Sequence, residues 1–265
     1  MILLIAEIKG KISSTGSNLS ERLEDKLTGD FFGSLRYIPF NKAPKSILSK
    51  TKILKENYTQ ILDTVNKLDI DYWDNNIEFW PYDSLGELDV LLDFEEIVIG
   101  IEVKLYSGLS SDDGVDNSVY DYVAESNNQL SRESRILNKK IMDTKKSAFL
   151  IFIAPEYNCY PICKEAYERN IIEDSVVIGY LPWEEILAVL ENEVISEELT
   201  KYEKLIIQDL IELLKRKGLE RFRSFNIECP NIDSDLYFEF KGKETIDIDF
   251  TFNHRVVTEG YYEFK

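Results

Sequence analysis

Two apolar runs, residues 86–92 and 97–105, constrain the fold of this chain more than any other feature, because an acidic turn separates them. Runs of this length and composition are typical of β-strands. A hairpin whose turn is centred just after Glu95 sets Asp89 directly opposite Glu102. Facing residues of neighbouring strands have Cβ atoms about 4.5–5.5 Å apart. The sequence therefore predicts two carboxylates close enough to bind one ion.

A lysine accompanies the second carboxylate. Successive side chains of a strand alternate between its two faces, so Glu102 and Lys104 share a face and Val103 points the other way. Two carboxylates with open remaining positions suit Mg²⁺, which is usually bound by one or two carboxylates, waters and substrate phosphate. A lysine beside such an ion can hold a scissile phosphate or align the attacking water. The pattern indicates a metal-dependent phosphodiesterase site.

The Glu-Xaa-Lys spacing alone is a weak signal, since four other triplets of this kind occur in the chain. Only the triplet at residues 102–104 follows an apolar strand with an acidic residue at hairpin distance, and only this triplet has predicted helices upstream and downstream. The structural alternative is a ladder of surface salt bridges. Burying three charges in apolar strands without a function is costly, so the site is favoured over the ladder.

The composition excludes several kinds of site and surface. A single histidine, His254, excludes a histidine-based triad and a multi-histidine metal centre. Three cysteines in a chain of 265 residues argue against a disulfide framework. The net charge of −18 argues against a broad basic surface for nucleic acid. Bound divalent cations nevertheless add positive charge where a phosphate docks.

The hydropathy pattern bears on localisation. No apolar run approaches the ~18–20 residues of a membrane span, and the N-terminus has neither a basic leader nor a cleavage site. We therefore expect a cytoplasmic protein that does not enter a membrane.

The chain is predicted to contain a main domain, residues 1–195, and an appendage, residues 196–265. The appendage begins with an amphipathic helix over residues 200–218, closed by Gly218. It continues with period-two alternation, which is typical of a small antiparallel sheet. We expect the appendage to serve in assembly or recognition.

Helices and strands alternate along the predicted main domain. A helix over residues 19–32 carries Glu24 at the border of its buried face, from which a carboxylate reaches the edge of the sheet. The other predicted elements are a strand at 1–8, a helix at 54–68, strands at 77–82, 86–92 and 97–105, a loop at 107–117, a helix at 118–144, a strand at 148–154, a helix at 161–172, a strand at 175–181 and a helix at 183–190. This order predicts an α/β fold.

The order of the elements that carry the polar residues resembles the PD-(D/E)xK nuclease superfamily. The helix with Glu24 is followed by the strand with Asp89, the strand with Glu102, a helix and a strand, over residues 17–155. Residues 23–39 are also similar to the opening of bacterial members associated with restriction and phage defence. The resemblance implies a restriction-endonuclease-like αβββαβ core, with a mixed central sheet flanked by helices.

The resemblance also implies roles for individual residues. In this superfamily an Asp and a Glu bind Mg²⁺ or Mn²⁺, a lysine assists the attack of water, and a glutamate on the first helix joins the metal shell in some members. Many members place a glutamine on the helix after the lysine strand, within a Gln-Xaa3-Tyr pattern. Carried over by position, the catalytic residues are Asp89, Glu102, Lys104, Glu24 and Gln129. The metal ligands are Asp89, Glu102, the Val103 carbonyl and Glu24.

The chain departs from the superfamily pattern at two positions. Glu133 stands where the tyrosine would, and the sequence Gly-Glu-Leu-Asp ending at Asp89 replaces a Pro-Asp pair. Glu87 shares a strand face with Asp89, where it is either an auxiliary ligand or a solvated neighbour.

These patterns and the resemblance lead us to expect a metal-dependent nuclease that hydrolyses DNA, with a partner protein or a homodimer formed through the C-terminal region. Two alternatives stay open. A catalytically inactive, nuclease-fold binding subunit of a larger complex agrees with the acidic chain. An RNA-directed nuclease would use the same residues, because nothing in the sequence reads a 2′-hydroxyl.

Overall fold

The computed structural model of the chain describes residues 9–11, 23–54, 60–113 and 126–221. The strands in these residues are β1 (Lys52–Ile53), β2 (Ile77–Phe79), β3 (Tyr82–Asp83), β4 (Gly86–Glu87), β5 (Val90–Asp93), β6 (Ile97–Val103), β7 (Ser147–Ala154) and β8 (Val176–Pro182). The main sheet has six strands in the order β1-β8-β7-β6-β5-β2, and β3 pairs with β4 in a small second sheet.

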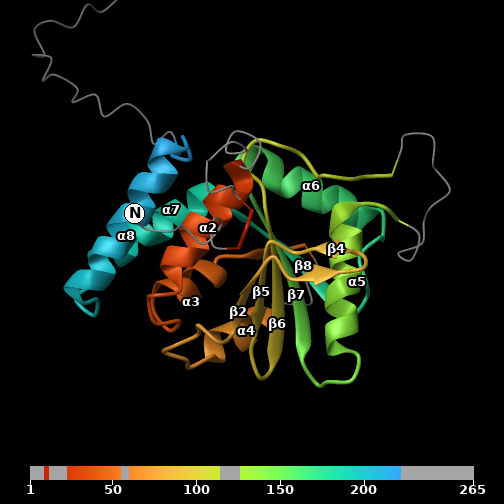
Figure 1. Cartoon of the computed structure of the whole chain (residues 1–265), viewed down its shortest axis with the longest axis horizontal. Helices are drawn as coiled ribbons and strands as arrows, with labels where there is room; N and C mark the ends of the chain where they lie inside the picture. The colour runs from red at the N-terminus through yellow and green to blue at the C-terminus, as the bar shows by residue number, and fades with distance from the viewer. Residues whose placement is uncertain (1–8, 12–22, 55–59, 114–125, 222–265) are drawn as a thin grey trace, which may run out of the picture. The chain divides into compact units, whose positions relative to one another are not determined.

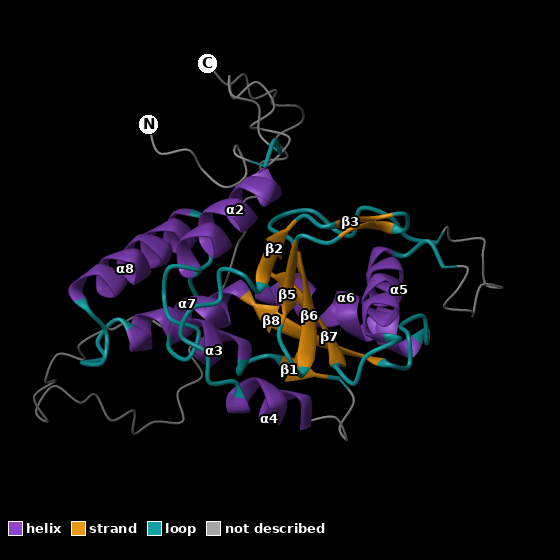
Figure 2. Ribbon diagram, turned by 60° about the horizontal axis from the view of Figure 1, so that its bottom comes forward, coloured by secondary structure: helices purple, strands orange, loops and turns teal. Residues whose placement is uncertain are grey.

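Helices cover both faces of the main sheet. The helices of the described residues are α2 (Leu23–Leu35), α3 (Ala43–Leu48), α4 (Gln60–Lys67), α5 (Gln129–Ile141), α6 (Glu156–Glu168), α7 (Trp183–Glu193) and α8 (Lys201–Arg216). Figure 1 shows α2, α3, α7 and α8 on one side of the sheet and α5 on the other, and Figure 2 shows the same arrangement from a second direction. The chain therefore has an α/β fold with a mixed sheet, as predicted.

The sheet combines both strand directions. β6, β7 and β8 run parallel to one another, whereas β5 pairs antiparallel with β6, and β2 pairs antiparallel with β5. In the β5–β6 hairpin Val90 faces Ile101 and Leu92 faces Ile99. This is the predicted register, which is thereby confirmed. Asp89 immediately precedes β5, so the same register continued by one residue sets it against Glu102.

Two apolar cores flank the sheet. Along β6 the side chains of Ile99 and Ile101 lie in the core shared with α2, α3, α4, α7 and α8, while Val98 lies in the core shared with α5 and α6. Strand β7 is buried from Ala148 to Ala154, as predicted for a strand covered on both faces. Gly100 permits the close approach of α5, since a Cβ at this position would lie 2.9 Å from the Cδ1 of Leu137.

Helix α8 belongs to the main core. Thr200 caps its start in a capping box with Glu203. Gly218 follows its end with a φ of 73°, and the Leu219 N–H donates to the Leu214 carbonyl at 3.2 Å, which completes a Schellman motif.

The compact unit that contains α8 spans Met1–Phe222, so its boundary lies well beyond the predicted end of the main domain at residue 195. The predicted appendage sheet, His254 and the predicted strand at 1–8 lie outside the described residues.

Several element boundaries differ from the predictions. Of the helix expected at 118–144, the described residues show the helix Gln129–Ile141, which Asn128 caps by accepting hydrogen bonds from two backbone N–H groups. The strand expected at 86–92 is divided into β4 and β5. The helix expected to start at Pro161 starts at Glu156 instead, because the Glu156 N–H donates to the Glu184 carboxylate at 2.9 Å and anchors the first turn. The structure also contains α3 and β1, which the sequence did not indicate.

None of the described helices combines the length and the apolar character that crossing a membrane requires.

Candidate active site

The predicted site residues meet where β6 ends, on the side of the sheet that α5 covers. Glu102 lies on β6, Lys104 follows the strand directly, Glu24 comes from α2 and Gln129 is the first residue of α5. Glu102 and Lys104 share a face because they are two residues apart on an extended chain. Residues separated by 78 and 27 positions from Glu102 therefore approach one carboxylate.

Glu102 accepts two hydrogen bonds on the same oxygen. Its Oε1 lies 2.6 Å from the Lys104 Nζ and 2.5 Å from the Gln129 Nε2. Only 2% of Glu102 is exposed, so both bonds form away from water. Burial, followed by the charge of Glu133, raises the pKa of Glu102 well above its usual range, although the Lys104 ammonium opposes this shift.

Hydrogen bonds hold the backbone N–H and carbonyl of Lys104, and its ammonium group contacts Glu102. Its N–H donates to the Ile153 carbonyl at 2.7 Å, and its carbonyl accepts from the Trp183 Nε1 at 3.0 Å. Burial lowers the pKa of Lys104, but the carboxyl groups of Glu102, Asp89 and Glu24 together outweigh burial, so the pKa lies above its usual value. Lys104 is therefore a charged group at neutral pH.

Asp89 is held between two strands. Its Oδ2 accepts the Val103 N–H at 2.8 Å, and its carbonyl accepts the Trp80 N–H at 3.0 Å. Burial and the charge of Glu102 raise the pKa of Asp89 well above its usual range. This effect of one carboxyl on the other agrees with the close approach that the hairpin register predicts.

Glu24 anchors the backbone that follows Lys104. Its Oε1 accepts the Leu105 N–H at 3.0 Å and the Ser107 hydroxyl at 2.7 Å. Its other oxygen lies 3.8 Å from the Lys104 Nζ. Glu24 thus fixes the end of β6 with one oxygen and faces the site with the other.

Gln129 links the site to the loop after β6. Its Nε2 donates to Glu102, and its Oε1 accepts the Ser110 N–H at 2.8 Å and the Ser110 hydroxyl at 3.0 Å. The loop is held in turn by Arg169, which pairs with Asp112 at 2.9 Å and with Asp113 at 2.5 Å. These contacts fix the start of α5 and hence the position of Gln129.

Glu133 adds a carboxyl group that the prediction did not place in the site. It lies one helical turn after Gln129, on the same face of α5, and only 2% of it is exposed. Burial raises the pKa of Glu133 to about 8, and the charge of Asp89 acts in the same direction. The spacing of four residues from Gln129 is the sequence signal that could have identified it.

Glu87 stays outside the site, because it is exposed and pairs with Lys11. Sequence reasoning also missed Ser107, Ser110 and Arg169, which no periodic pattern connects to the site.

The raised pKa of Glu133 predicts a pH dependence of stability in metal-free buffer. An ordinary Glu has a pKa of 4.5, so the folded chain holds the proton of the Glu133 carboxyl group more tightly than the unfolded chain does. The stability that this proton provides is fully present below the pKa of the unfolded chain, and it is lost as the pH rises towards the pKa of the folded chain, about 8. Glutamine does not titrate. Between pH 4.5 and about 8 the free energy of unfolding of Glu133→Gln should therefore rise, relative to that of the wild type, by about 1.4 kcal/mol for each pH unit.

Urea unfolding of both chains across this pH range, with EDTA present, measures the difference. A difference that is independent of pH would show that Glu133 titrates normally.

The donor set fits a divalent cation held by a small number of protein oxygens. Within the described ranges no three Asp, Glu, His or Cys side chains are arranged to enclose an ion. The charge of Glu102 nevertheless raises the pKa of Asp89, and the charge of Glu133 raises the pKa of Glu102. A cation would relieve this crowding of negative charge. Two carboxylates completed by water and phosphate are the set that Mg²⁺ prefers.

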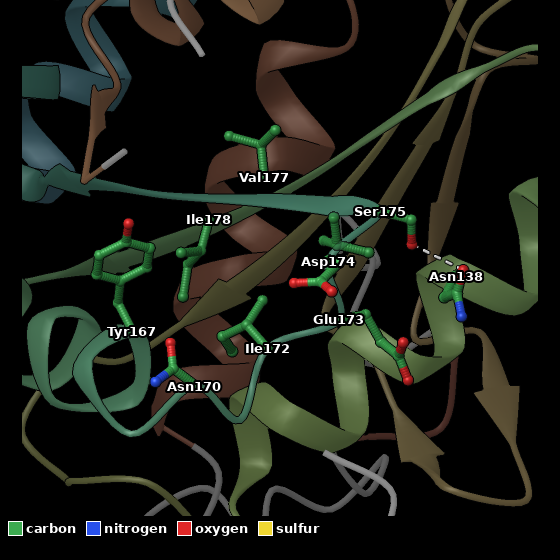
Figure 3. Close-up of a pocket in the computed structure, with 10 residues that line it drawn as sticks. Asn138, Tyr167, Asn170, Ile172, Glu173, Asp174, Ser175, Val177 and Ile178 are labelled. Atoms are coloured by element: carbon green, nitrogen blue, oxygen red, sulfur yellow. Dashed lines mark hydrogen bonds between the residues drawn. The ribbon is translucent and has the colours of Figure 1, made fainter. Parts of the chain in front are cut away.

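A separate pocket of about 650 Å³ lies where β8 begins. Figure 3 shows that Ser175 and Asn138 form a hydrogen bond at its edge, with Glu173 and Asp174 nearby. This pocket includes none of the predicted site residues, and its charged lining residues are both acidic. Its chemistry disfavours a phosphate group.

Comparison with known proteins finds no matching family model, no similar curated protein and no similar solved structure. The functional assignment therefore depends on the residues and their geometry.

Proposed function

We propose that this protein is a metal-dependent nuclease that hydrolyses DNA phosphodiester bonds. The observation that carries the proposal is the buried Glu102 carboxylate, which receives hydrogen bonds from Lys104 and Gln129 on one oxygen while Asp89 approaches from the neighbouring strand. Removing a charged lysine and several carboxyl groups from water costs folding free energy, so a contribution to stability does not explain why they are buried together. A phosphate-cleaving site gives these groups a use.

The order of elements supports the same proposal. When the short elements α3, β1, α4, β3 and β4 are set aside, the remaining elements α2, β2, β5, β6, α5 and β7 have the αβββαβ order of restriction-endonuclease-like nucleases. Glu102 lies on the third strand of this series, Asp89 directly precedes the second strand, and Lys104 directly follows the third. We infer that the chain has such a core, and a role in bacterial restriction or phage defence agrees with this inference.

The site residues would divide the chemistry between them. Asp89, Glu102 and the Val103 carbonyl would hold Mg²⁺ or Mn²⁺, which when bound polarises the phosphate and makes water a better nucleophile. Lys104, charged and fixed at its backbone, would offset negative charge on the phosphoryl oxygens. Glu24 would hold the chain after Lys104, with its free oxygen directed towards the site. Gln129 would keep the Glu102 carboxylate in one orientation.

The acidic chain favours one second candidate, a nuclease-fold subunit that binds without cleaving. A net charge of −18 repels nucleic acid over most of the surface, so such a chain would act through a basic protein partner. The two functions differ in their need for a cation, since only the nuclease requires one at Asp89 and Glu102. RNA as a substrate stays a further alternative, because the cleavage chemistry is shared.

Thermal unfolding with added cation tests the proposed site. We expect Mn²⁺ or Ca²⁺ at millimolar concentration to raise the melting temperature of the wild type, because a ligand that binds only the folded chain stabilises it. Asp89→Asn should lose most of this increase while unfolding normally without cation. Asp63→Asn, a change on α4 far along the chain from the site, is the matched control. An equal increase for the wild type and Asp89→Asn would exclude Asp89 as a ligand.

A further inference from the structure

Arg132, near the start of α5, is a fixed cation that is bound only to neutral groups. Its guanidinium donates from Nη1 to the Leu85 carbonyl, from Nη2 to the Ser111 hydroxyl at 2.9 Å and from Nε to the Asn127 carbonyl at 3.4 Å. Among the described residues no carboxylate forms an ion pair with Arg132. The described surroundings therefore hold the side chain in place without neutralising its charge.

Other arginines of the described residues are neutralised or stacked. Arg36 lies over the ring of Tyr37, with its Cζ 5.1 Å from the ring centroid. Three arginines pair with carboxylates, namely Arg169, Arg216 and Arg221. The chain has 49 acidic residues and 31 basic ones, so carboxylate partners are abundant. The neutral acceptors of Arg132 leave its charge available to an anion.

The guanidinium of Arg132 also keeps donors for a ligand. A guanidinium has five N–H groups, and the three hydrogen bonds use one on each nitrogen. One N–H on Nη1 and one on Nη2 therefore have no described acceptor. The side chain is half-buried, so a ligand can reach it. Two N–H groups beside a positive charge match two oxygens of a phosphate.

The position of Arg132 is next to the candidate active site. Leu85 lies four residues before Asp89, and Ser111 belongs to the loop after β6 that Gln129 holds through Ser110. The guanidinium thus lies between the segment that leads to Asp89 and the loop that leaves the site.

Gly86 allows the β3–β4 hairpin to approach Arg132. A Cβ at residue 86 would collide with the Arg132 Nη1, and the φ of 150° is one that residues with side chains rarely adopt. The hairpin therefore contacts the guanidinium through its backbone, and no side chain at residue 86 covers Nη1.

We propose that Arg132 binds a phosphate of the DNA backbone that flanks the scissile phosphate. The ligand is a phosphodiester because the guanidinium offers a positive charge and two N–H groups to an anion beside the site. The inference rests on the proposed function, since the phosphate belongs to the proposed substrate. It also supplies positive charge locally, where a net charge of −18 opposes the approach of DNA.

The salt dependence of DNA binding by the full chain tests the inference without any measurement of cleavage. Fluorescence anisotropy of a labelled duplex, at a fixed low Ca²⁺ concentration and a series of KCl concentrations, gives the association constant K. Each phosphate contact contributes about −0.9 to the slope of log K against log salt concentration. Arg132→Gln should therefore have a slope that is less steep by about 0.9 and bind about tenfold more weakly at about 0.1 M salt.

Two further variants serve as controls. Arg132→Lys keeps the charge, so it should restore the wild-type slope although a lysine cannot bind a phosphate through a planar pair of N–H groups. Arg216→Gln, at an exposed position of α8, is the matched control and should equal the wild type in slope and affinity.

The slope separates a phosphate contact from a structural role. Wild-type affinity of Arg132→Gln, or weaker binding with an unchanged slope, would overturn the inference and leave the proposed nuclease function standing. The increase in melting temperature with Mn²⁺ should be the same for Arg132→Gln and the wild type, which shows that the cation site is intact. If Arg132→Gln does not fold, Arg132→Met tests the same loss of slope. A wild type that does not bind DNA would overturn the inference together with the proposed function.

Discussion

Lys104→Met is expected to slow metal-dependent hydrolysis of DNA by about 10²–10³-fold, the range seen when one preorganised group that stabilises the transition state is removed. Methionine keeps the length and the apolar stem of lysine and removes only the charge. Lys104 is buried, charged and fixed through both of its backbone groups, which makes it a preorganised cation. Single-turnover cleavage of an end-labelled duplex in Mg²⁺ measures the rate.

A matched lysine controls for the loss of one positive charge. Lys139 lies on α5 with its side chain 46% exposed and pairs with Asp83 at 3.0 Å. Lys139→Met should cleave at close to the wild-type rate. If Lys104→Met were as fast as Lys139→Met, the lysine would have no part in the chemistry, and the binding function would be favoured.

Glu102→Ala is expected to lower the free energy of unfolding by about 3–5 kcal/mol, because it leaves a buried charge without its partner. The Lys104 ammonium would keep the charge of Asp89 and the more distant Glu24, at 3.8 Å. The Gln129 amide group would lose its acceptor as well. Urea unfolding followed by circular dichroism gives the value.

A double change separates the unpaired charge from the cavity that alanine leaves. Glu102→Ala combined with Lys104→Met removes both members of the pair, so it should be less destabilising than Glu102→Ala alone. If the double change were as destabilising as the sum of the two single changes, the two side chains would not interact in the folded chain.

The hairpin could be predicted because its determinants are local. Only four residues separate the facing positions Asp93 and Val98, and a shift by one residue would turn Ile99 and Ile101 away from their core. The register then followed from the apolar pattern. Lys104 was placed on the face of Glu102 by the same alternation. The helical spacing of residues 19–32 directed Glu24 towards the edge of the sheet, whereas Gln129 depended on the resemblance. The structure brings both side chains to the end of β6.

The start of α5 could not be predicted because distant contacts determine it. Asn128 donates to Asp112 at 2.9 Å, and Asp112 is held by Arg169, which is 57 residues away in sequence. No periodicity relates these positions. The buried position of Glu133 depends on the same packing of α5 against β6. A helical pattern shows that Gln129 and Glu133 share a face but not that a carboxylate lies opposite that face.

The acidic chain and a phosphate-cleaving site are compatible if the positive charge is local. Lys104 is the cation next to Glu102, and bound metal ions would supply the remainder where the substrate docks. Weak binding of DNA in EDTA and tighter binding in Ca²⁺ would accord with this account.

Cleavage of end-labelled DNA by the purified wild-type chain, compared with Asp89→Asn in Mg²⁺, in Mn²⁺ and in EDTA, tests the central claim most directly. Asparagine keeps the shape of the side chain that accepts the Val103 N–H and removes the charge that would bind the ion. The account predicts cleavage by the wild type with either metal ion, none in EDTA and none by Asp89→Asn. Equal cleavage by the two chains, or no cleavage by the wild type with either ion, would contradict it.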